Sequence, residues 1–143
     1  MIPLGNGRGP ERINIFGGIM SLHDFNTMLP EEVTATYLRK AALGENLTVA
    51  RVEVKAGEIT QLHEHAGEEV ILVLSGAWRF YLQGGETTLT ANQMLCIPAG
   101  AEHSSEVLED TVAIDICAAP RWDWMSGADR VLHQDPNQFL WAV

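Results

Sequence analysis

The sequence is poor in the residues that mark several common classes of protein. It has only two cysteines in 143 residues, too few for a small secreted scaffold held together by disulfides. Lysine and arginine number 9 against 19 aspartate and glutamate, which gives a formal net charge of -10. Nucleic acids and anionic membrane surfaces both bind clustered basic residues. We therefore expect no nucleic-acid partner and no membrane association.

Long hydrophobic runs are also missing. No run approaches the roughly 18 apolar residues of a membrane-spanning helix. The segment Met1–Asn6 lacks the basic and apolar regions of a signal peptide. Cys96 and Cys117 both lie within apolar stretches that read as strands, which predicts reduced thiols in the core rather than a disulfide. These features together predict a cytoplasmic protein.

The composition that remains is that of one globular domain. The chain is 46% hydrophobic and 20% charged, and its length allows a sizeable buried core. Within a single domain over residues 1–143 we expect three parts. These are an N-terminal arm (residues 1–32), a barrel core (residues 47–117) and an aromatic-rich C-terminal tail (residues 121–143).

Hydrophobic periodicity predicts short strands and indicates no helix. Residues 47–54 alternate, with Ala50, Val52 and Val54 on one face, and Gly84-Gly85 is a hairpin signal between two further strands. Turn residues recur every eight to twelve positions along the chain. This pattern predicts an all-β fold, either an antiparallel sandwich or a barrel.

The strand that begins at Glu69 has two distinct faces. We expect it to end at Gly76, with a new strand from Ala77 to Gln83. Val70, Leu72 and Leu74 point away from the Glu69 face, and we expect them to build the core. Ile71 and Val73 share the Glu69 face, so they are expected to line the apolar wall of a cavity.

The stretch from Gly57 to Gly76 carries the strongest chemical signal. His63 and His65 are two residues apart, so on an extended chain both imidazoles point to the same face. Glu69 keeps the same parity. Two imidazoles and one carboxylate on a common face make most of a divalent metal site. His103, just after the turn Pro98-Ala99-Gly100, supplies a fourth candidate ligand.

These stretches resemble the two signature motifs of the cupin superfamily. The first motif has a glycine, the sequence His-x-His, a glutamate and a closing glycine at fixed spacing, and all its positions are matched: Gly57, His63, His65, Glu69 and Gly76. The second is matched at Pro98, Gly100 and His103, while Asn92 and Val107 stand where a glycine and an asparagine are expected.

The resemblance spans roughly residues 47–123 and implies a fold and a cofactor. The implied fold is a double-stranded β-helix, a small jelly roll, with a metal inside the barrel. One divalent ion held by the four candidate ligands is expected, and zinc, nickel, iron or manganese all suit three imidazoles and one carboxylate. Asn92 tolerates the positive φ that a glycine would supply at its turn.

Asp115 and Arg121 form a second candidate constellation. Asp115 lies on a strand whose opposite face is apolar, so its carboxylate must point to water, a partner or a cavity. On residue chemistry alone, the two side chains are either a salt bridge at the rim, unrelated surface charges, or catalytic groups. The segment from Asp115 to Asp123 resembles the last strand of KdgF-type cupins, which linearise 4,5-unsaturated monouronates. Cys117 departs from that pattern, since it stands where an aromatic residue is expected.

The KdgF-type resemblance implies a metal-dependent isomerase or lyase. Arg121 and the metal would hold a carboxylate-bearing substrate such as an unsaturated sugar acid, and Asp115 would move a proton. The alternatives are a cupin dioxygenase or polyketide cyclase acting on an aromatic or phenolic substrate, and a non-catalytic cupin that binds a metal and a ligand.

The C-terminal tail is rich in tryptophan. Trp122, Trp124, Phe139 and Trp141 are expected to pack on the barrel or on a second subunit, or else to supply an aromatic roof for the pocket. From this tail and the N-terminal arm we expect a homodimer.

Overall fold

A computed structural model describes residues 11–15, 18–118 and 120–133 of the chain. Most of these residues are in strands. The elements are β1 (Glu11–Ile15), β2 (Gly18–Leu22), β3 (Glu31–Thr34), β4 (Tyr37–Leu43), β5 (Thr48–Val54), β6 (Ile59–His63), β7 (Glu69–Leu82), β8 (Gly85–Leu89), β9 (Met94–Ile97), β10 (His103–Cys117), α1 (Trp122–Ser126) and the 3₁₀ helix η1 (Ala128–His133).

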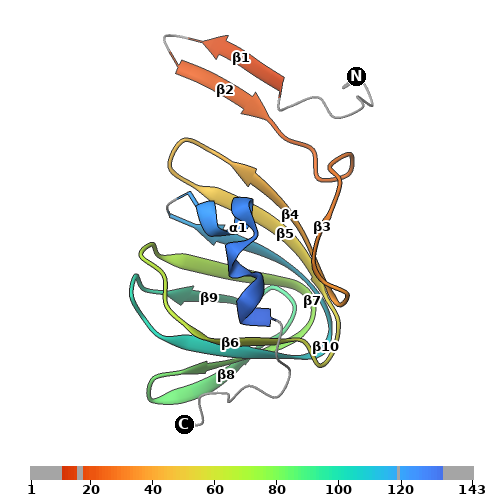
Figure 1. Cartoon of the computed structure of the whole chain (residues 1–143), viewed down its shortest axis with the longest axis vertical. Helices are drawn as coiled ribbons and strands as arrows, with labels where there is room; N and C mark the ends of the chain where they lie inside the picture. The colour runs from red at the N-terminus through yellow and green to blue at the C-terminus, as the bar shows by residue number, and fades with distance from the viewer. Residues whose placement is uncertain (1–10, 16–17, 119, 134–143) are drawn as a thin grey trace.

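The strands β3 to β10 form one antiparallel system that wraps into a jelly roll (Figure 1). The first half of β10 pairs with β6 and with the second half of β7, which in turn pairs with β8. The second half of β10 pairs with β5 and with the first half of β7, and β4 and β9 continue this layer at its two ends. The predicted all-β double-stranded β-helix is confirmed.

Two long bent strands link the layers, which corrects the prediction that a strand ends at Gly76. Both β7 and β10 run through the corner without interruption, and their pairing shifts register between Val107 and Ala113. Gly76 has φ of 97°, and a Cβ atom there would lie 2.3 Å from the carbonyl oxygen of Asp110. The glycine therefore lets the two backbones cross closely while the strand bends.

The core lies on the Glu69 face of β7, so the expected core face was wrong. Ile71 and Val73 are buried, whereas Val70 and Leu72 are only partly buried on the outer face, where Leu74 is 43% exposed. Sequence alternation separates the two faces of a strand but does not say which face is inside, and here both faces are apolar.

Two other sequence expectations have different outcomes. The face of β5 formed by Ala50, Val52 and Val54 is buried, as predicted. Cys117 is buried and free, but the free thiol of Cys96 is exposed, because β9 turns that side chain outward. The expectation that both cysteines lie in the core is therefore wrong for Cys96.

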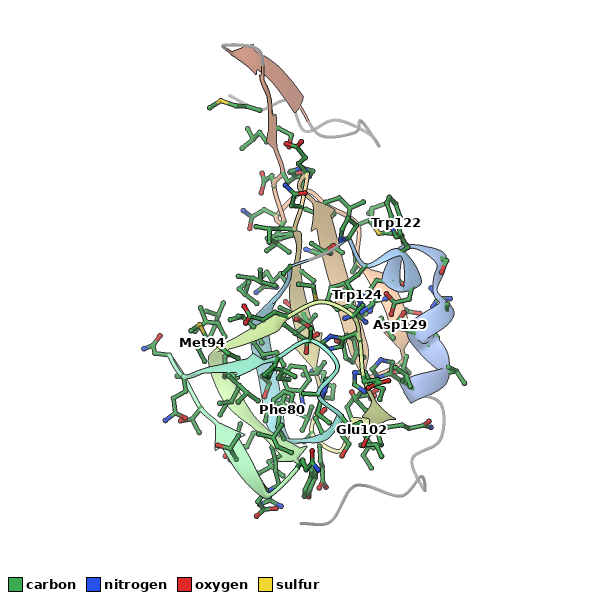
Figure 2. The ribbon with its side chains drawn as sticks, turned by 90° about the vertical axis from the view of Figure 1, so that its left-hand side faces the viewer. Phe80, Met94, Glu102, Trp122, Trp124 and Asp129 are labelled. Atoms are coloured by element: carbon green, nitrogen blue, oxygen red, sulfur yellow. The ribbon has the colours of Figure 1, made fainter. Side chains whose placement is uncertain are left out.

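The C-terminal segment contains two short helices, α1 and η1, that the sequence pattern did not indicate. Both pack beside the barrel (Figure 1), and Trp124 and Asp129 face the strands while Trp122 lies on the outer side (Figure 2). Trp124 is 4% exposed and Trp122 is 67% exposed. Phe139 and Trp141 lie outside the described residues. α1 ends at Gly127, whose φ of 78° suits a glycine cap.

The two N-terminal strands stand apart from the barrel. β1 and β2 form their own two-stranded sheet, which extends from one end of the molecule (Figure 1). Among the described residues, none of the helices has the length and apolar character needed to cross a bilayer.

Candidate metal centre

Two paired strands and the connection that follows one of them contribute to one cluster of histidines. His63 ends β6 and His103 begins β10, and the two residues are direct partners in the sheet. His65 lies in the connection that leads to Glu69, the first residue of β7. Each of the three imidazoles offers a ring nitrogen that lies within 4.8 Å of the others. The four candidate ligands are therefore brought together by strand pairing as well as by the short spacing in the sequence.

Backbone carbonyls hold all three imidazoles in one tautomer. The Nδ1 atoms of His63 and His103 donate to the carbonyl oxygens of Gln61 and Ala101, at 2.7 and 2.8 Å. The Nδ1 atom of His65 donates to the carbonyl oxygen of Gly67 at 2.7 Å. With the proton on Nδ1, each Nε2 atom keeps a free lone pair.

The unpaired Nε2 atoms of this cluster are suited to bind a metal ion. The Nε2 atoms of His65 and His103 are buried and accept or donate no hydrogen bond. Burying an unpaired polar atom is unfavourable by about 1–3 kcal/mol, so a native site normally supplies a partner. A divalent cation satisfies converging imidazole lone pairs, and carbonyl acceptors on the opposite nitrogen are the usual second layer of such a site.

Glu69 completes the cluster with a negative charge. Its carboxylate oxygens lie 3.5 Å from Nε2 of His65 and 3.8 Å from Nε2 of His103. Although burial raises the pKa of Glu69, attraction to the neighbouring His65, His103 and Arg121 lowers it to about 2. Glu69 is therefore ionised over the whole physiological range and is ready to bind a cation.

The imidazole pKa values follow from burial and from their neighbours. Burial, together with the adjacent His103, lowers the pKa of His63 to about 4. Burial likewise lowers the pKa of His103, whereas the nearby Glu69 carboxylate raises the pKa of His65. Neutral imidazole is the form that binds metals, and two of the three rings favour that form at neutral pH.

Asp115 lies in the same interior, on β10 opposite Ile71 of β7. It is 5% exposed, and together with Glu69 and Cys117 it forms a buried acidic cluster whose ligand atoms lie within 4.8 Å of one another. Burial and the neighbouring charge of Glu69 raise the pKa of Asp115 well above its usual value. Of the environments expected for this carboxylate, the structure places it in a cavity.

Arg121 is held by other partners than Asp115. Its Nε and Nη2 atoms donate to the Asp123 carboxylate at 2.8 and 2.7 Å. Its Nη1 atom donates to Glu69 at 3.3 Å and to the sulfur of Cys117 at 3.5 Å. The interpretation as a rim salt bridge between Asp115 and Arg121 is therefore wrong, because the guanidinium is buried and points toward the histidine cluster.

A cavity joins these groups. Its lining includes His63, Glu69, His103, Asp115 and Arg121. One apolar side is built by Ile71 of β7 with Trp78 and Phe80, the aromatic side chains beyond the bend. Val73 is buried but does not appear in that lining, so only Ile71 of the two residues expected there forms the wall.

Several lining residues were not identified from the sequence. Tyr37 of β4, Thr60 of β6, and Asp129 and His133 of η1 all face the cavity. Trp124 also lines it, so the tail both packs on the barrel and supplies an aromatic residue to the pocket. The alternation of Tyr37 and Arg39 along β4 was the one available signal, since both side chains face inward. The residues of η1 gave none.

Comparison with known proteins agrees with this architecture. A family model described as "Cupin domain" matches residues 50–117, which contain all four candidate ligands and Asp115. Residues 50–117 form a cupin domain. No curated protein matches the sequence significantly.

Solved structures show the same fold at low sequence identity. KdgF from a Halomonas species superposes with a TM-score of 0.66 and 23% identity, covering 71% of this chain and 96% of the other. An RmlC-like cupin from Shewanella frigidimarina gives a TM-score of 0.67 and 18% identity, with 71% and 93% coverage. Ectoine synthase from P. lautus gives 0.58 and 16%, with 65% and 72% coverage. At these identities the likeness establishes the cupin fold alone.

Proposed function

We propose that this cupin is a metal-dependent enzyme that acts on a small carboxylate-bearing molecule. His63, His65, Glu69 and His103 would hold one divalent ion, of zinc, nickel, iron or manganese. The observation that carries the proposal is the convergence of unpaired Nε2 atoms on a buried carboxylate, with Nδ1 of every ring fixed by a carbonyl. When bound, the ion would supply Lewis-acid stabilisation of negative charge on a substrate oxygen.

Arg121 would bind the substrate carboxylate together with the metal ion. Asp123 occupies two donors on one edge of its guanidinium, and Nη1 donates to Glu69, which lines the same cavity. A buried arginine beside a cavity binds a carboxylate strongly, because the pair forms charge-assisted hydrogen bonds in a low dielectric. The net charge of -10 over the whole chain makes such a local positive group necessary for an anionic substrate.

Asp115 is the candidate proton-transfer group. It lines the same cavity as Arg121 and the imidazoles, and Cys117 lies beside it rather than a bulkier aromatic side chain. In the opening of a 4,5-unsaturated monouronate, the ring C–O bond breaks, the anomeric hydroxyl loses its proton to give an aldehyde, and a proton is added to the alkene carbon. Atoms balance without an oxidant, so one carboxyl that accepts and returns a proton is sufficient.

The test is a substrate assay combined with metal analysis. Purified protein is analysed for bound divalent metal, and unsaturated monouronates are then followed by NMR for loss of the alkene proton and appearance of the open-chain product. Stoichiometric metal and catalysed ring opening would support the proposal. Metal binding without any acceleration of ring opening would remove this substrate class.

A dioxygenase or polyketide cyclase is a second candidate, favoured by one observation. Ile71, Trp78, Phe80 and Trp124 give the cavity an apolar and aromatic side that suits a phenolic substrate. Oxygen consumption during turnover of a polyphenol would favour the dioxygenase, and cyclisation without it would favour the cyclase. Tight stoichiometric binding without product would favour the third reading, a non-catalytic binding cupin.

We also propose a homodimer. The β1–β2 hairpin is a separate two-stranded sheet, and an isolated hairpin is marginally stable at best in water. The outer face of the barrel carries Leu74 and Met94, which are 43% and 57% exposed, beside partly buried Leu72 and Ile114. Light scattering of the full chain gives the test: a dimer mass supports the proposal, and a monomer mass across micromolar concentrations contradicts it.

A further inference from the structure

The orientation of Arg121 depends on the aromatic ring beneath it. The guanidinium carbon lies 4.4 Å from the centroid of the Trp124 ring, while Asp123 binds one edge of the group. An arginine side chain presents its donors in a rigid planar fork. A small rotation of that plane would therefore move Nη1 away from a substrate carboxylate even though the positive charge would stay in the cavity.

A second arginine lies over the same indole. The guanidinium carbon of Arg39 is 4.8 Å from the Trp124 centroid, and Arg39 is 1% exposed. Each cation has its own carboxylate: Asp123 for Arg121, and Asp129 for Arg39. The two cations therefore share one aromatic ring without an unbalanced charge, and the indole couples the position of one to that of the other.

Arg39 also ties the helical segment to the barrel. From its fixed place in β4 it donates through Nη1 and Nη2 to both oxygens of Asp129, at 2.6 and 3.0 Å, and through Nη2 to the carbonyl oxygen of Trp124 at 3.4 Å. It also donates to Glu31 through Nε and Nη2 at 3.3 and 3.1 Å. Figure 2 shows Trp124 and Asp129 between the helical segment and the strands.

We infer that Arg39 is a positioning residue for Arg121, acting through the Trp124 ring and the Asp129 carboxylate. This inference rests on the proposed role of Arg121 in holding the substrate carboxylate. Arg39 does not line the cavity. Its contribution is to fix the α1 turn, and thereby the plane of the Arg121 guanidinium, over the buried Glu69 carboxylate.

The experiment measures carboxylate binding without requiring turnover. Full-length protein is loaded with Co²⁺, and oxalate is titrated while the visible absorption of the cobalt centre is followed. Arg39→Lys keeps the positive charge but replaces the planar fork by a point-like ammonium that cannot hold Asp129, Glu31 and the Trp124 carbonyl together. We expect about tenfold weaker oxalate binding, the scale of one lost charge-assisted hydrogen bond.

Arg130→Gln is the matched control. Arg130 lies on η1 and pairs with the same Glu31 at 3.0 Å, but its side chain is 46% exposed, and the cations over the Trp124 ring are Arg39 and Arg121. We expect oxalate affinity to stay within about twofold of the unmodified protein, because exposed ion pairs contribute little. A loss equal to that of Arg39→Lys would overturn the inference, since it would assign the effect to general loosening of η1.

A double-mutant cycle separates positioning from general stability. In an Arg121→Gln background, Arg39→Lys should cause no further loss of oxalate affinity, because the group it positions is already gone. The same fold-loss in both backgrounds, or a changed Co²⁺ stoichiometry in Arg39→Lys, would overturn the inference while leaving the proposed function standing. If Arg39→Lys does not fold, Trp124→Phe is taken through the same cycle with the same expectation.

A different result, in the Arg121→Gln variant alone, would contradict the proposed function itself. Unchanged oxalate affinity in Arg121→Gln alone would show that Arg121 does not hold a carboxylate, and both the proposed carboxylate site and the positioning role would then be withdrawn.

Discussion

Arg39 and Asp129 form a two-point ion pair, at 2.6 and 3.0 Å, between residues 90 positions apart in the sequence. Arg39 is 1% and Asp129 is 4% exposed, so the pair is buried between β4 and η1. It joins the C-terminal segment to the barrel next to the candidate metal centre.

Replacing Asp129 by Asn should destabilise the protein most at neutral pH. The variant leaves the Arg39 charge without its buried partner, which costs about 3–5 kcal/mol. Burial raises the pKa of Asp129, but hydrogen bonds from His133 and Arg39 lower it well below its usual value. Its stabilising contribution is thus present above the unfolded-state pKa of about 3.9 and is lost as the pH falls toward the folded-state value.

The measurement is urea unfolding of both proteins from pH 7 to pH 3. The difference in unfolding free energy between unmodified protein and Asp129→Asn should shrink as the pH falls below about 4. Glu32→Gln serves as a control, because Glu32 is an exposed carboxylate on β3, and its difference should stay near zero throughout. A constant difference for Asp129→Asn would contradict the ion-pair assignment.

Removing one imidazole should abolish tight metal binding. His103→Ala deletes a ring whose Nε2 atom is buried and unpaired, and we expect affinity to fall by more than about a hundredfold, since even loss of an outer partner of a ligand costs 10–100-fold. Competition with a chromophoric chelator gives the affinity. His23→Ala is the control, as His23 hydrogen bonds to Ser21 in the N-terminal arm, and its affinity should not change.

Asp115→Asn should eliminate turnover of the substrate while the protein still folds and binds metal. The change keeps the size of the side chain and removes its capacity to accept and return a proton. We expect at least a hundredfold fall in kcat, in line with the usual contribution of about 10²–10⁴ from general acid–base catalysis. Metal content and thermal unfolding are measured on the same samples, and retained turnover would exclude Asp115 from proton transfer.

Gly76→Ala should be among the most destabilising substitutions in the barrel. The new Cβ atom would lie 2.3 Å from the Asp110 carbonyl oxygen and 2.4 Å from Oγ1 of Thr111, in a residue with φ of 97°. We expect more than about 3 kcal/mol of lost unfolding free energy, from strain and overpacking together. Gly84→Ala measures the loss of unfolding free energy that comes from the positive φ alone, because the φ of Gly84 is 90° and nothing lies within 4 Å of the added Cβ atom. Equal losses in the two variants would contradict the close crossing at Gly76.

The sequence predicted local features well where the spacing of residues determines the outcome. His63, His65 and Glu69 lie close together because they fall within seven positions of one another, on a segment that bends at Ala66 and Gly67. Asn92 adopts a positive φ of 68° where the motif has a glycine, as expected from the tolerance of asparagine for that region. The alternation of Ala50, Val52 and Val54 identified a buried face correctly.

Where the physical cause lies between distant segments, local pattern could not supply the answer. The strand β7 was expected to break at Gly76, but the glycine instead permits a bend past Asp110, which the sequence alone does not place nearby. Both faces of β7 are apolar, so only the closure of the barrel around the core cluster decided that Ile71 lies inside and Leu72 outside. The partners of Arg121 were also misjudged, because its contact with Glu69 crosses 52 positions.

The amino-acid order by itself indicated an all-β sandwich or barrel and four candidate ligands, since turn residues and metal-ligand spacing are local properties of the chain, and the motif resemblance narrowed this to a cupin barrel. Tertiary structure alone decided that Trp124, Asp129 and Arg39 meet beside these ligands and that Arg121 faces them. Those contacts join β4 to a C-terminal segment with no periodic signal, and they form because the buried charges of the segment find partners only on the folded barrel.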